Sequence, residues 1–172
     1  QGIVYTCPSG SYYLDKYEQQ SVGFVVQDLS TGNFVGSARI IRDNAFGPYG
    51  LPTATSKEIE IYPENRSEVD SAPVEFSQFA KDDNAPHIIA PMLLRAAVEF
   101  SIWNRLPYWI ATIDDKVLKL LNGFAYSFAL PKVGPAMEYL GSSSTPVNIN
   151  FLKALANAML TSVDSRRSRS QI

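Results

Sequence analysis

The chain has 172 residues, of which 45% are hydrophobic and 19% are charged, a composition typical of a globular protein and too apolar for a disordered one. Fifteen basic and 17 acidic residues give a net charge of -2, so the broad positive field that sequence-independent nucleic-acid binding requires is missing. No apolar run approaches the roughly 18 residues of a membrane span. The single cysteine, Cys7, cannot form an internal disulfide, which favours a reducing, cytoplasmic location.

The first predicted element is a β-hairpin, because two β-branched, apolar runs at 22–27 and 34–41 flank a turn-forming segment at 29–33. Residues 43–68 contain several Pro and Gly and show little periodicity. They are therefore predicted to form a long loop with at most one short strand. Such a loop is either a lid or pocket wall, or a solvated connection.

The second half of the chain alternates between strand and helix patterns. The predicted elements are a strand at 73–80, a helix at 91–104, a strand at 108–113, a helix at 116–121, extended segments at 127–130 and 146–149, and a final helix from Phe151 to about Met159. This order predicts an α/β (α+β) fold with a mixed, largely antiparallel central sheet and helices on both faces. We expect one domain over residues 1–172, with residues 1–14 and 165–172 at its periphery.

Several common site motifs are missing from the sequence. Neither a Walker sequence nor a GxGxxG motif occurs, so nucleotide sites of those types are unsupported. One histidine and one cysteine cannot supply a conventional zinc site, and no metal site is predicted. His87 is interpreted as a surface residue rather than a base, and Cys7 as an inert thiol.

Two charged residues within apolar strand patterns are the candidate chemical groups. Glu75 lies between Val74 and Phe76, where burial would raise the pKa of a carboxyl group toward the range of a general base. Arg39 also lies within an apolar strand pattern, and a buried Arg needs a carboxylate partner. The sequence leaves two interpretations open: Glu75 is a general base, or Glu75 and Arg39 form a structural ion pair.

Several segments, taken in chain order, resemble the autoinducer synthases and the related long-chain N-acyl amino acid synthases. The matching segments are Asp15–Glu18 (DKYE), Gly36–Arg39 (GSAR), Val74–Ala80 (VEFSQFA), Asn122–Phe124 (NGF) and Val133–Gly141 (VGPAMEYLG). Together they span about residues 15–149, although each motif is short. The resemblance implies a fold like that of the GCN5-related N-acetyltransferases, in which an amine attacks an acyl thioester.

The resemblance also implies site residues and a donor. The donor would be the acyl-phosphopantetheine of acyl carrier protein, with no tightly bound cofactor. Glu75 becomes the general base, acting directly or through water. Arg39, Asp15 and Glu18 would shape the acceptor side of the site. The backbone N–H groups around Phe79 and Ala80 would bind the oxyanion.

Two positions depart from the family pattern. Gln78 replaces an arginine that autoinducer synthases use beside their S-adenosylmethionine pocket, which favours a plain amino acid as the acceptor. Lys119 stands where acetyltransferases of this fold often have a tyrosine that protonates the departing thiolate. A thiolate leaves readily without that help.

A long acyl chain and a carrier protein each require a surface of their own. The candidate acyl-binding residues are Phe76, Phe79, Trp103, Trp109, Phe124, Phe128 and Met137, although ordinary core packing also explains such residues. The candidate carrier-binding residues are Arg95, Arg105, Lys116, Lys119 and Lys132, although solvated helix faces explain them equally well.

Three functions remain open at this point. The leading hypothesis is an N-acyl amino acid synthase that acylates the α-amino group of an amino acid, with tyrosine or another aromatic as the favoured acceptor. The second is an N-acyl-homoserine lactone synthase that uses S-adenosylmethionine. The third is a non-catalytic module that binds a carrier or lipid.

Overall fold

The computed structural model describes residues 3–7, 10–43, 45, 47–123, 127–154 and 156–157. By their internal contacts, the described residues form two units: unit 1 lies within Gln1–Pro52 and Pro73–Arg105, and unit 2 lies within Thr53–Ala72 and Leu106–Ile172. The single acyltransferase domain over residues 1–172 stays a prediction.

Unit 1 begins with a short hairpin followed by three paired strands. In the hairpin, β1 (Ile3–Cys7) pairs antiparallel with β2 (Gly10–Leu14). A one-turn 3-10 helix, η1 (Glu18–Gln20), leads into the strands β3 (Ser21–Gln27), β4 (Phe34–Arg42) and β5 (Val74–Lys81). Both β3 and β5 pair antiparallel with β4, which confirms the predicted hairpin and the strand that follows it.

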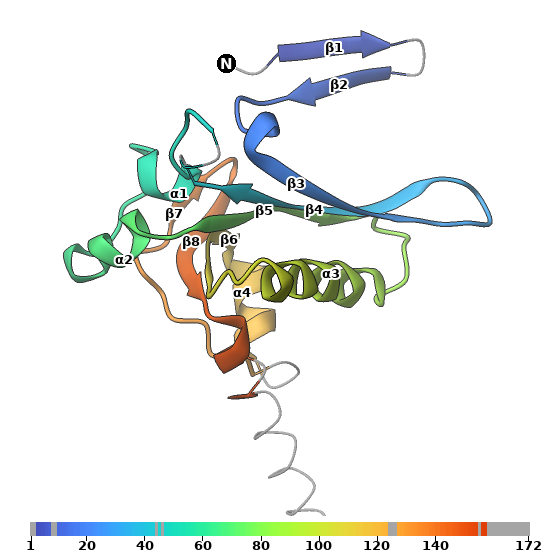
Figure 1. Ribbon diagram of the computed structural model, residues 1–172. Coiled ribbons are helices and arrows are strands. Elements are labelled where there is room, and N and C mark those ends of the chain that lie inside the picture. The colour runs from blue at the N-terminus through green and yellow to red at the C-terminus, as the bar shows by residue number, and fades with distance from the viewer. Residues whose placement is uncertain are drawn as a thin grey trace, which may run out of the picture. The chain divides into compact units, whose positions relative to one another are not determined.

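The helix α3 (Ile89–Trp103) lies along β3, β4 and β5 (Figure 1). Its apolar positions repeat at helical spacing, so one stripe meets the strands: the ring of Phe100 packs against that of Phe24 with centroids 5.7 Å apart. A Cβ at Gly36 would meet the side chains of Ile89 and Leu93. From Gly36 to Arg42, the even-numbered residues of β4 therefore point toward α3. The odd-numbered residues of this stretch point to the opposite face.

The described part of unit 2 contains short helices, three antiparallel strands, one longer helix and a helical segment that follows the strands. Its elements are α1 (Pro52–Thr55, whose first residue belongs to unit 1), η2 (Pro63–Asn65), α2 (Arg66–Asp70), β6 (Trp109–Asp114), α4 (Asp115–Asn122), β7 (Met137–Tyr139) and β8 (Ser142–Ile149). The strand β8 pairs antiparallel with both β6 and β7. Asp114 caps α4 by accepting a 2.8 Å hydrogen bond from the Lys116 backbone N–H.

The structure confirms the predicted fold class and corrects several details of the prediction. Residues 43–68, predicted as a loop with at most one strand, contain α1, η2 and the start of α2. These helices of three to five residues are too short to produce a periodic pattern. Residues 127–130 form no strand, while residues 151–154 and 156–157 are helical. Among the described residues, no helix has the length and apolarity needed to cross a membrane.

Gly134 provides a test of packing in unit 2. A Cβ at this position would collide with the carbonyl oxygen of Glu60 and would lie 2.7 Å from Cγ of Pro146. We expect Gly134→Ala to lower the free energy of unfolding by about 1–3 kcal/mol, the usual range for overpacking, as measured by urea denaturation. Gly23→Ala is the control, because a Cβ at Gly23 meets no heavy atom within 4 Å. Equal effects of the two substitutions would contradict this account.

Candidate functional site

Arg39 lies in the middle of β4, on the face opposite α3, with only 7% of its side chain exposed. Its guanidinium donates hydrogen bonds of 3.0 and 2.7 Å to the two carboxylate oxygens of Asp15. It also donates a 3.3 Å hydrogen bond to Glu18. A buried guanidinium requires such partners, so this ion pair network holds the segment before β3 against β4.

The carboxyl group of Asp15 is held in its charged form. Burial by itself would raise the pKa of Asp15, but the hydrogen bonds from Arg39 and from the Tyr17 backbone N–H outweigh burial. The pKa of Asp15 therefore lies below its usual value. The arrangement places a fixed negative charge next to Arg39 at neutral pH.

The strand register brings Glu75 to the same face as Arg39. Gly23 and Ser77 lie directly opposite Arg39 on β3 and β5, and Glu75 lies opposite Ile41. Residues 39 and 41 of one strand share a face, so Glu75 is the diagonal neighbour of Arg39. Glu75 is 4% exposed. Arg39 forms ion pairs with Asp15 and Glu18, and a structural pair between Arg39 and Glu75 stays a prediction.

The strand β5 contains a β-bulge just after Glu75. Arg39 pairs with Ser77, but Ser37 pairs with Ala80, so two residues of β5 stand opposite Ala38 alone. These two residues are Gln78 and Phe79, and Gln78 has a φ of 50°. A left-handed backbone at a residue other than Gly costs about 1–2 kcal/mol. The bulge interrupts the regular ladder with β4 at the backbone that was expected to bind an oxyanion.

An aromatic cluster, which the sequence did not predict, lies next to Asp15 and Glu18, the acidic pair. The rings of Tyr17 and Tyr49 meet edge to face with centroids 6.0 Å apart, and the Lys16 ammonium lies over both rings. The side chain of Gln20 donates to the backbone carbonyls of Arg42 and Tyr49 at 2.7 Å. The acidic motif predicted the site but not this neighbour, because Tyr49 lies 29 residues from Gln20 in the chain.

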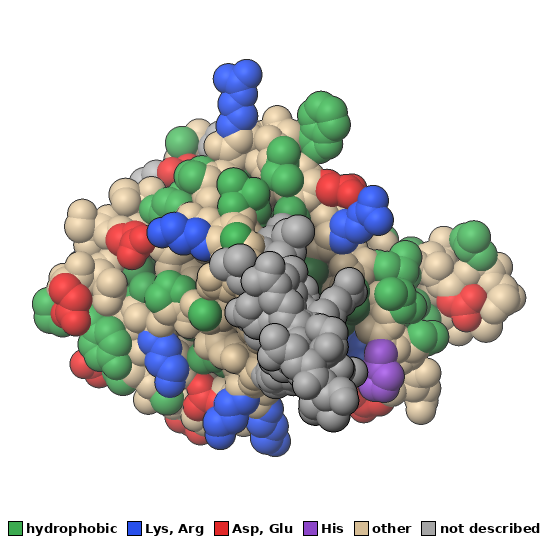
Figure 2. Space-filling model, turned by 90° about the horizontal axis from the view of Figure 1, so that it is seen from below, with side chains coloured by type: hydrophobic (Ala, Val, Ile, Leu, Met, Phe, Trp, Pro, Cys, Tyr) green, Lys and Arg blue, Asp and Glu red, His purple; other side chains and the backbone are tan. Residues whose placement is uncertain are grey.

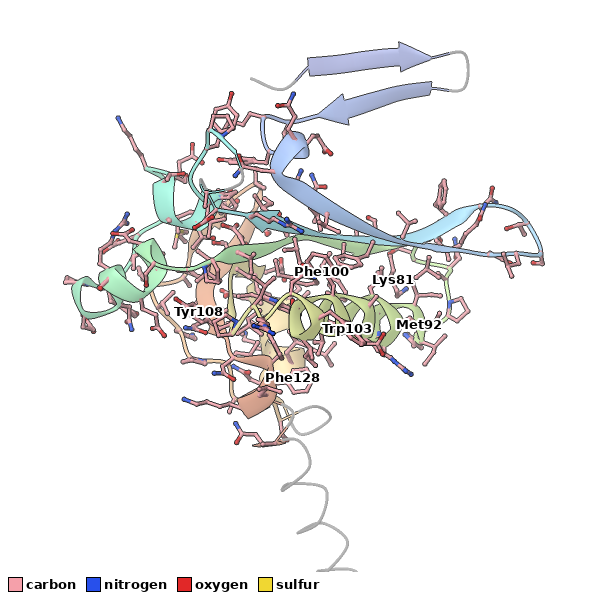
Figure 3. The ribbon with its side chains drawn as sticks, viewed as in Figure 1. Lys81, Met92, Phe100, Trp103, Tyr108 and Phe128 are labelled. Carbon is pink, nitrogen blue, oxygen red and sulfur yellow. The ribbon has the colours of Figure 1, made fainter. Side chains whose placement is uncertain are left out.

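The predicted acyl-binding residues occupy different environments. In unit 1, Phe76 is buried and contacts Phe79 at 5.6 Å between ring centroids, whereas Trp103 is 86% exposed at the end of α3 (Figure 3). In unit 2, Trp109 is buried against Phe151. Phe128 and Met137 are half-buried in unit 2, and Phe124 lies outside the described residues.

The predicted carrier-binding residues are exposed, but they are not equivalent. Arg95 forms a 2.7 Å ion pair with Glu99 on α3, so its charge is already balanced. Lys116 and Lys119 lie exposed on α4. Lys132 and Lys119 both lie near enough to Asp115 to help lower its pKa, although hydrogen bonds from Ser143 and Thr145 contribute more.

His87 and Cys7 are the remaining titratable candidates. His87, the single histidine of the chain, is exposed on the surface (Figure 2). Among the described residues, no group of three or more His, Cys, Asp or Glu side chains is arranged to hold a metal ion. Cys7 lies in β1, where its side chain is not described.

The chain has the fold of a group of acyl-transferring synthases. No family model matches the sequence, and no curated protein matches it. The structure is similar to FeeM, an N-acyl amino acid synthase from uncultured soil microbes, with a TM-score of 0.60 and 18% identity over 84% of this chain and 75% of FeeM.

Two homoserine lactone synthases are similar to the same extent. LasI matches with a TM-score of 0.59 and 19% identity over 90% of this chain and 78% of LasI. MesI, a CoA-dependent acyl-homoserine lactone synthase, matches with a TM-score of 0.56 and 16% identity over 90% of this chain and 75% of MesI. At these identities the likeness shows the fold, which confirms the predicted acyltransferase-like fold.

The ion pair between Asp15 and Arg39 predicts a pH-dependent stability. Because the pKa of Asp15 is lowered by folding, the stabilisation is present above the unfolded pKa of about 4 and is lost as the pH falls through the folded value. At pH 7 we expect Asp15→Asn to lower the free energy of unfolding by about 2 kcal/mol, which corresponds to about 6 °C in thermal midpoint.

The same measurement at lower pH separates this pair from ordinary surface pairs. The difference between wild type and Asp15→Asn should shrink below about pH 4, where Asp15 of the unfolded chain becomes protonated, and should be lost below the lower pKa that Asp15 has in the folded protein. Asp70→Asn is the matched control, because its ion pair with Arg66 is about half exposed and such pairs contribute about 0–1 kcal/mol. A difference that stays constant from pH 7 to pH 3 would show that the charge of Asp15 does not matter.

Proposed function

We propose that the chain is an N-acyltransferase that moves a long-chain acyl group from acyl carrier protein to the α-amino group of an amino acid. The observation that carries this proposal is the combination, within unit 1, of the bulge in β5 with Glu75 and the Arg39 network. The fold shared with FeeM, an N-acyl amino acid synthase, supports the same reaction class. The product would be an N-acyl amino acid, and the proposed location of the reaction is the cytoplasm.

Glu75 is assigned the role of general base. An α-amino group has a pKa of about 8 and is largely protonated at neutral pH, so the amine must lose a proton before its lone pair can attack. Glu75 accepts that proton, directly or through water. The amine nitrogen then forms a C–N bond to the thioester carbonyl carbon, and the C–S bond breaks. On acylation the nitrogen loses a second proton, and the departing thiolate of phosphopantetheine takes up this proton through solvent.

We assign the stabilisation of the oxyanion to the bulge in β5. Attack on the thioester places negative charge on the carbonyl oxygen, and backbone N–H groups within about 3 Å of it are effective donors. A bulge releases backbone groups from the ladder. We therefore assign this role to the backbone around Phe79 and Ala80, immediately after Gln78.

The acidic pair is assigned to the acceptor side. The carboxylates of Asp15 and Glu18 attract an ammonium group, and Arg39 keeps them in place. Gln78 is neutral where the autoinducer synthases have arginine, which favours a plain amino acid. Tyrosine or another aromatic amino acid is the proposed acceptor.

The second candidate is an N-acyl-homoserine lactone synthase. It is supported by the similarity to LasI and to BjaI, a CoA-dependent synthase solved with SAM and isopentyl-CoA, at a TM-score of 0.57 and 14% identity over 91% of this chain and 72% of BjaI. The third candidate, a non-catalytic carrier- or lipid-binding module, predicts no product from any acceptor.

The test is mass spectrometry of lipid extracts from bacteria that express either wild type or Glu75→Gln. We expect wild-type cells to contain a new N-acyl amino acid. We expect the variant to lower its rate of formation by about 100-fold or more, the scale for loss of a general base. Glu138→Gln is the matched control, because Glu138 is exposed on β7.

The possible outcomes separate the three functions. Acyl-homoserine lactones in place of N-acyl amino acids would support the second candidate. No new lipid from wild type, even with a supplied acyl carrier protein, would support the binding module. Unchanged turnover in a folded Glu75→Gln protein, with folding checked by circular dichroism, would remove Glu75 from the role of base.

The proposed donor is tested through the lysines of α4. A carrier protein presents an acidic surface, so replacing Lys116 and Lys119 together by Glu should raise KM for the acyl carrier protein about tenfold and leave kcat nearly unchanged. The KM should also lose much of its dependence on salt. Lys57→Glu, also at an exposed position of unit 2, is the control. An equal change in both variants would argue against a carrier contact on α4.

A further inference from the structure

Gly23 is a residue of the candidate site whose identity the fold does not require. It lies in the interior of β3, directly opposite Arg39. Glycine weakens a strand, because it has more backbone entropy to lose and no side chain to pack. A strand therefore keeps a glycine where a left-handed backbone, a close internal contact or a bound group requires one.

The first two reasons do not apply to Gly23. Its φ is outside the left-handed region, and a Cβ built on it meets no heavy atom within 4 Å among the described residues. Other glycines have an evident reason: Gly32 has a φ of 75°, and Gly36 faces Ile89 and Leu93. As far as the described residues go, the space above Gly23 is thus open on the side where its side chain would project.

That space lies on the face that carries the candidate chemical groups. Gly23, Arg39 and Ser77 form one row across the three strands, and Glu75 lies in the adjacent row. The face is the side of β3, β4 and β5 turned away from α3, which is the upper side of these strands in Figure 3. Glu75 and Gly23 are separated by two strand spacings and by two residues along the strand, or about 12 Å. A bulky side chain attached to an amine at Glu75 can extend toward Gly23 across this distance.

Arg39 provides a second indication that a bound group belongs on this row. Its Nε–H is buried and has no hydrogen-bond partner among the described residues. A buried charged donor without an acceptor is costly, and such donors are usually satisfied by a bound group or water. The carboxylate of an amino acid is an acceptor of suitable charge.

We propose that the space above Gly23 receives the side chain of the acceptor amino acid, so that Gly23 sets the acceptor size. The inference rests on the proposed N-acyltransferase function and deepens it. The absence of a side chain at residue 23 favours acceptors with large side chains, such as aromatic amino acids and leucine. A larger residue at this position excludes them sterically and leaves small acceptors, such as alanine and glycine, able to bind.

The test is competition between acceptors. Wild type, Gly23→Ala and Gly23→Val are each given one acyl carrier protein thioester and an equimolar mixture of tyrosine, leucine, alanine and glycine, and the products are quantified by mass spectrometry. We expect the ratio of large to small products to fall by about tenfold or more in Gly23→Val, the scale on which enzymes discriminate substrates by side-chain size. Gly23→Ala should fall between the two.

A matched control separates size from a local disturbance of β3. Val25 lies two residues after Gly23, on the same face of β3, and is 63% exposed. Val25→Leu therefore enlarges a neighbouring side chain without filling the space above Gly23. Its product ratio should equal that of wild type. Gly23→Val should also keep its thermal midpoint or raise it, because valine favours strands.

The outcomes distinguish this inference from the function on which it rests. If wild type makes N-acyl amino acids and the ratio is unchanged in Gly23→Val, the inference is wrong and the proposed function stands. If wild type makes no such product, both are wrong. A binding measurement gives an independent readout, since tyrosine should raise the thermal midpoint of wild type and lose that effect in Gly23→Val. Equal tyrosine-induced shifts in the two proteins would also overturn the inference.

Discussion

The burial of one guanidinium, that of Arg39, organises the candidate site. An unpaired buried charge is far too costly to keep, so β4 can hold Arg39 only if anions are brought to it. The anions come from Asp15 and Glu18, which lie 24 and 21 residues earlier in the chain. The segment before β3 is therefore tied to the middle of β4 by electrostatics and not by apolar packing alone. Its position places a pair of carboxylates on Arg39, the diagonal neighbour of Glu75.

The bulge in β5 is the second constraint, and it acts on the backbone. Continuing the regular pairing with β4 would satisfy every backbone group and would avoid the left-handed conformation of Gln78. The chain instead keeps two residues opposite Ala38, at a cost of about 1–2 kcal/mol in backbone strain. Backbone strain of this kind persists where the surrounding structure holds it in place, and it often marks functional sites. Glu75 lies three residues before Gln78, pairs regularly with β4 and has a buried side chain. The strand β5 therefore carries the fixed side chain of Glu75 close to the distorted backbone of Gln78.

Part of this arrangement could be predicted from the sequence, because some signals are local. Glu75 and Arg39 were found as charges within apolar strand patterns, and the long helix followed from its 3.6-residue periodicity. The partners of Arg39 depended on the family motif and not on spacing. The register that places Gly23 opposite Arg39 could not be predicted, because it depends on which residues of two strands pair. Hydrophobicity alone also could not separate Trp103, which is 86% exposed, from Trp109, which is 1% exposed.

The charges on this face explain why an arginine accompanies the carboxylates. Asp15 and Glu18 attract an ammonium group, but a purely acidic environment would also stabilise its protonated form and would oppose the loss of a proton that attack requires. The positive charge of Arg39 offsets part of that field, because its guanidinium lies within 3.3 Å of both carboxylates. The acceptor can then be attracted as an ammonium ion and deprotonated at the site. Binding and deprotonation make opposite electrostatic demands, and a carboxylate pair balanced by one buried arginine satisfies both.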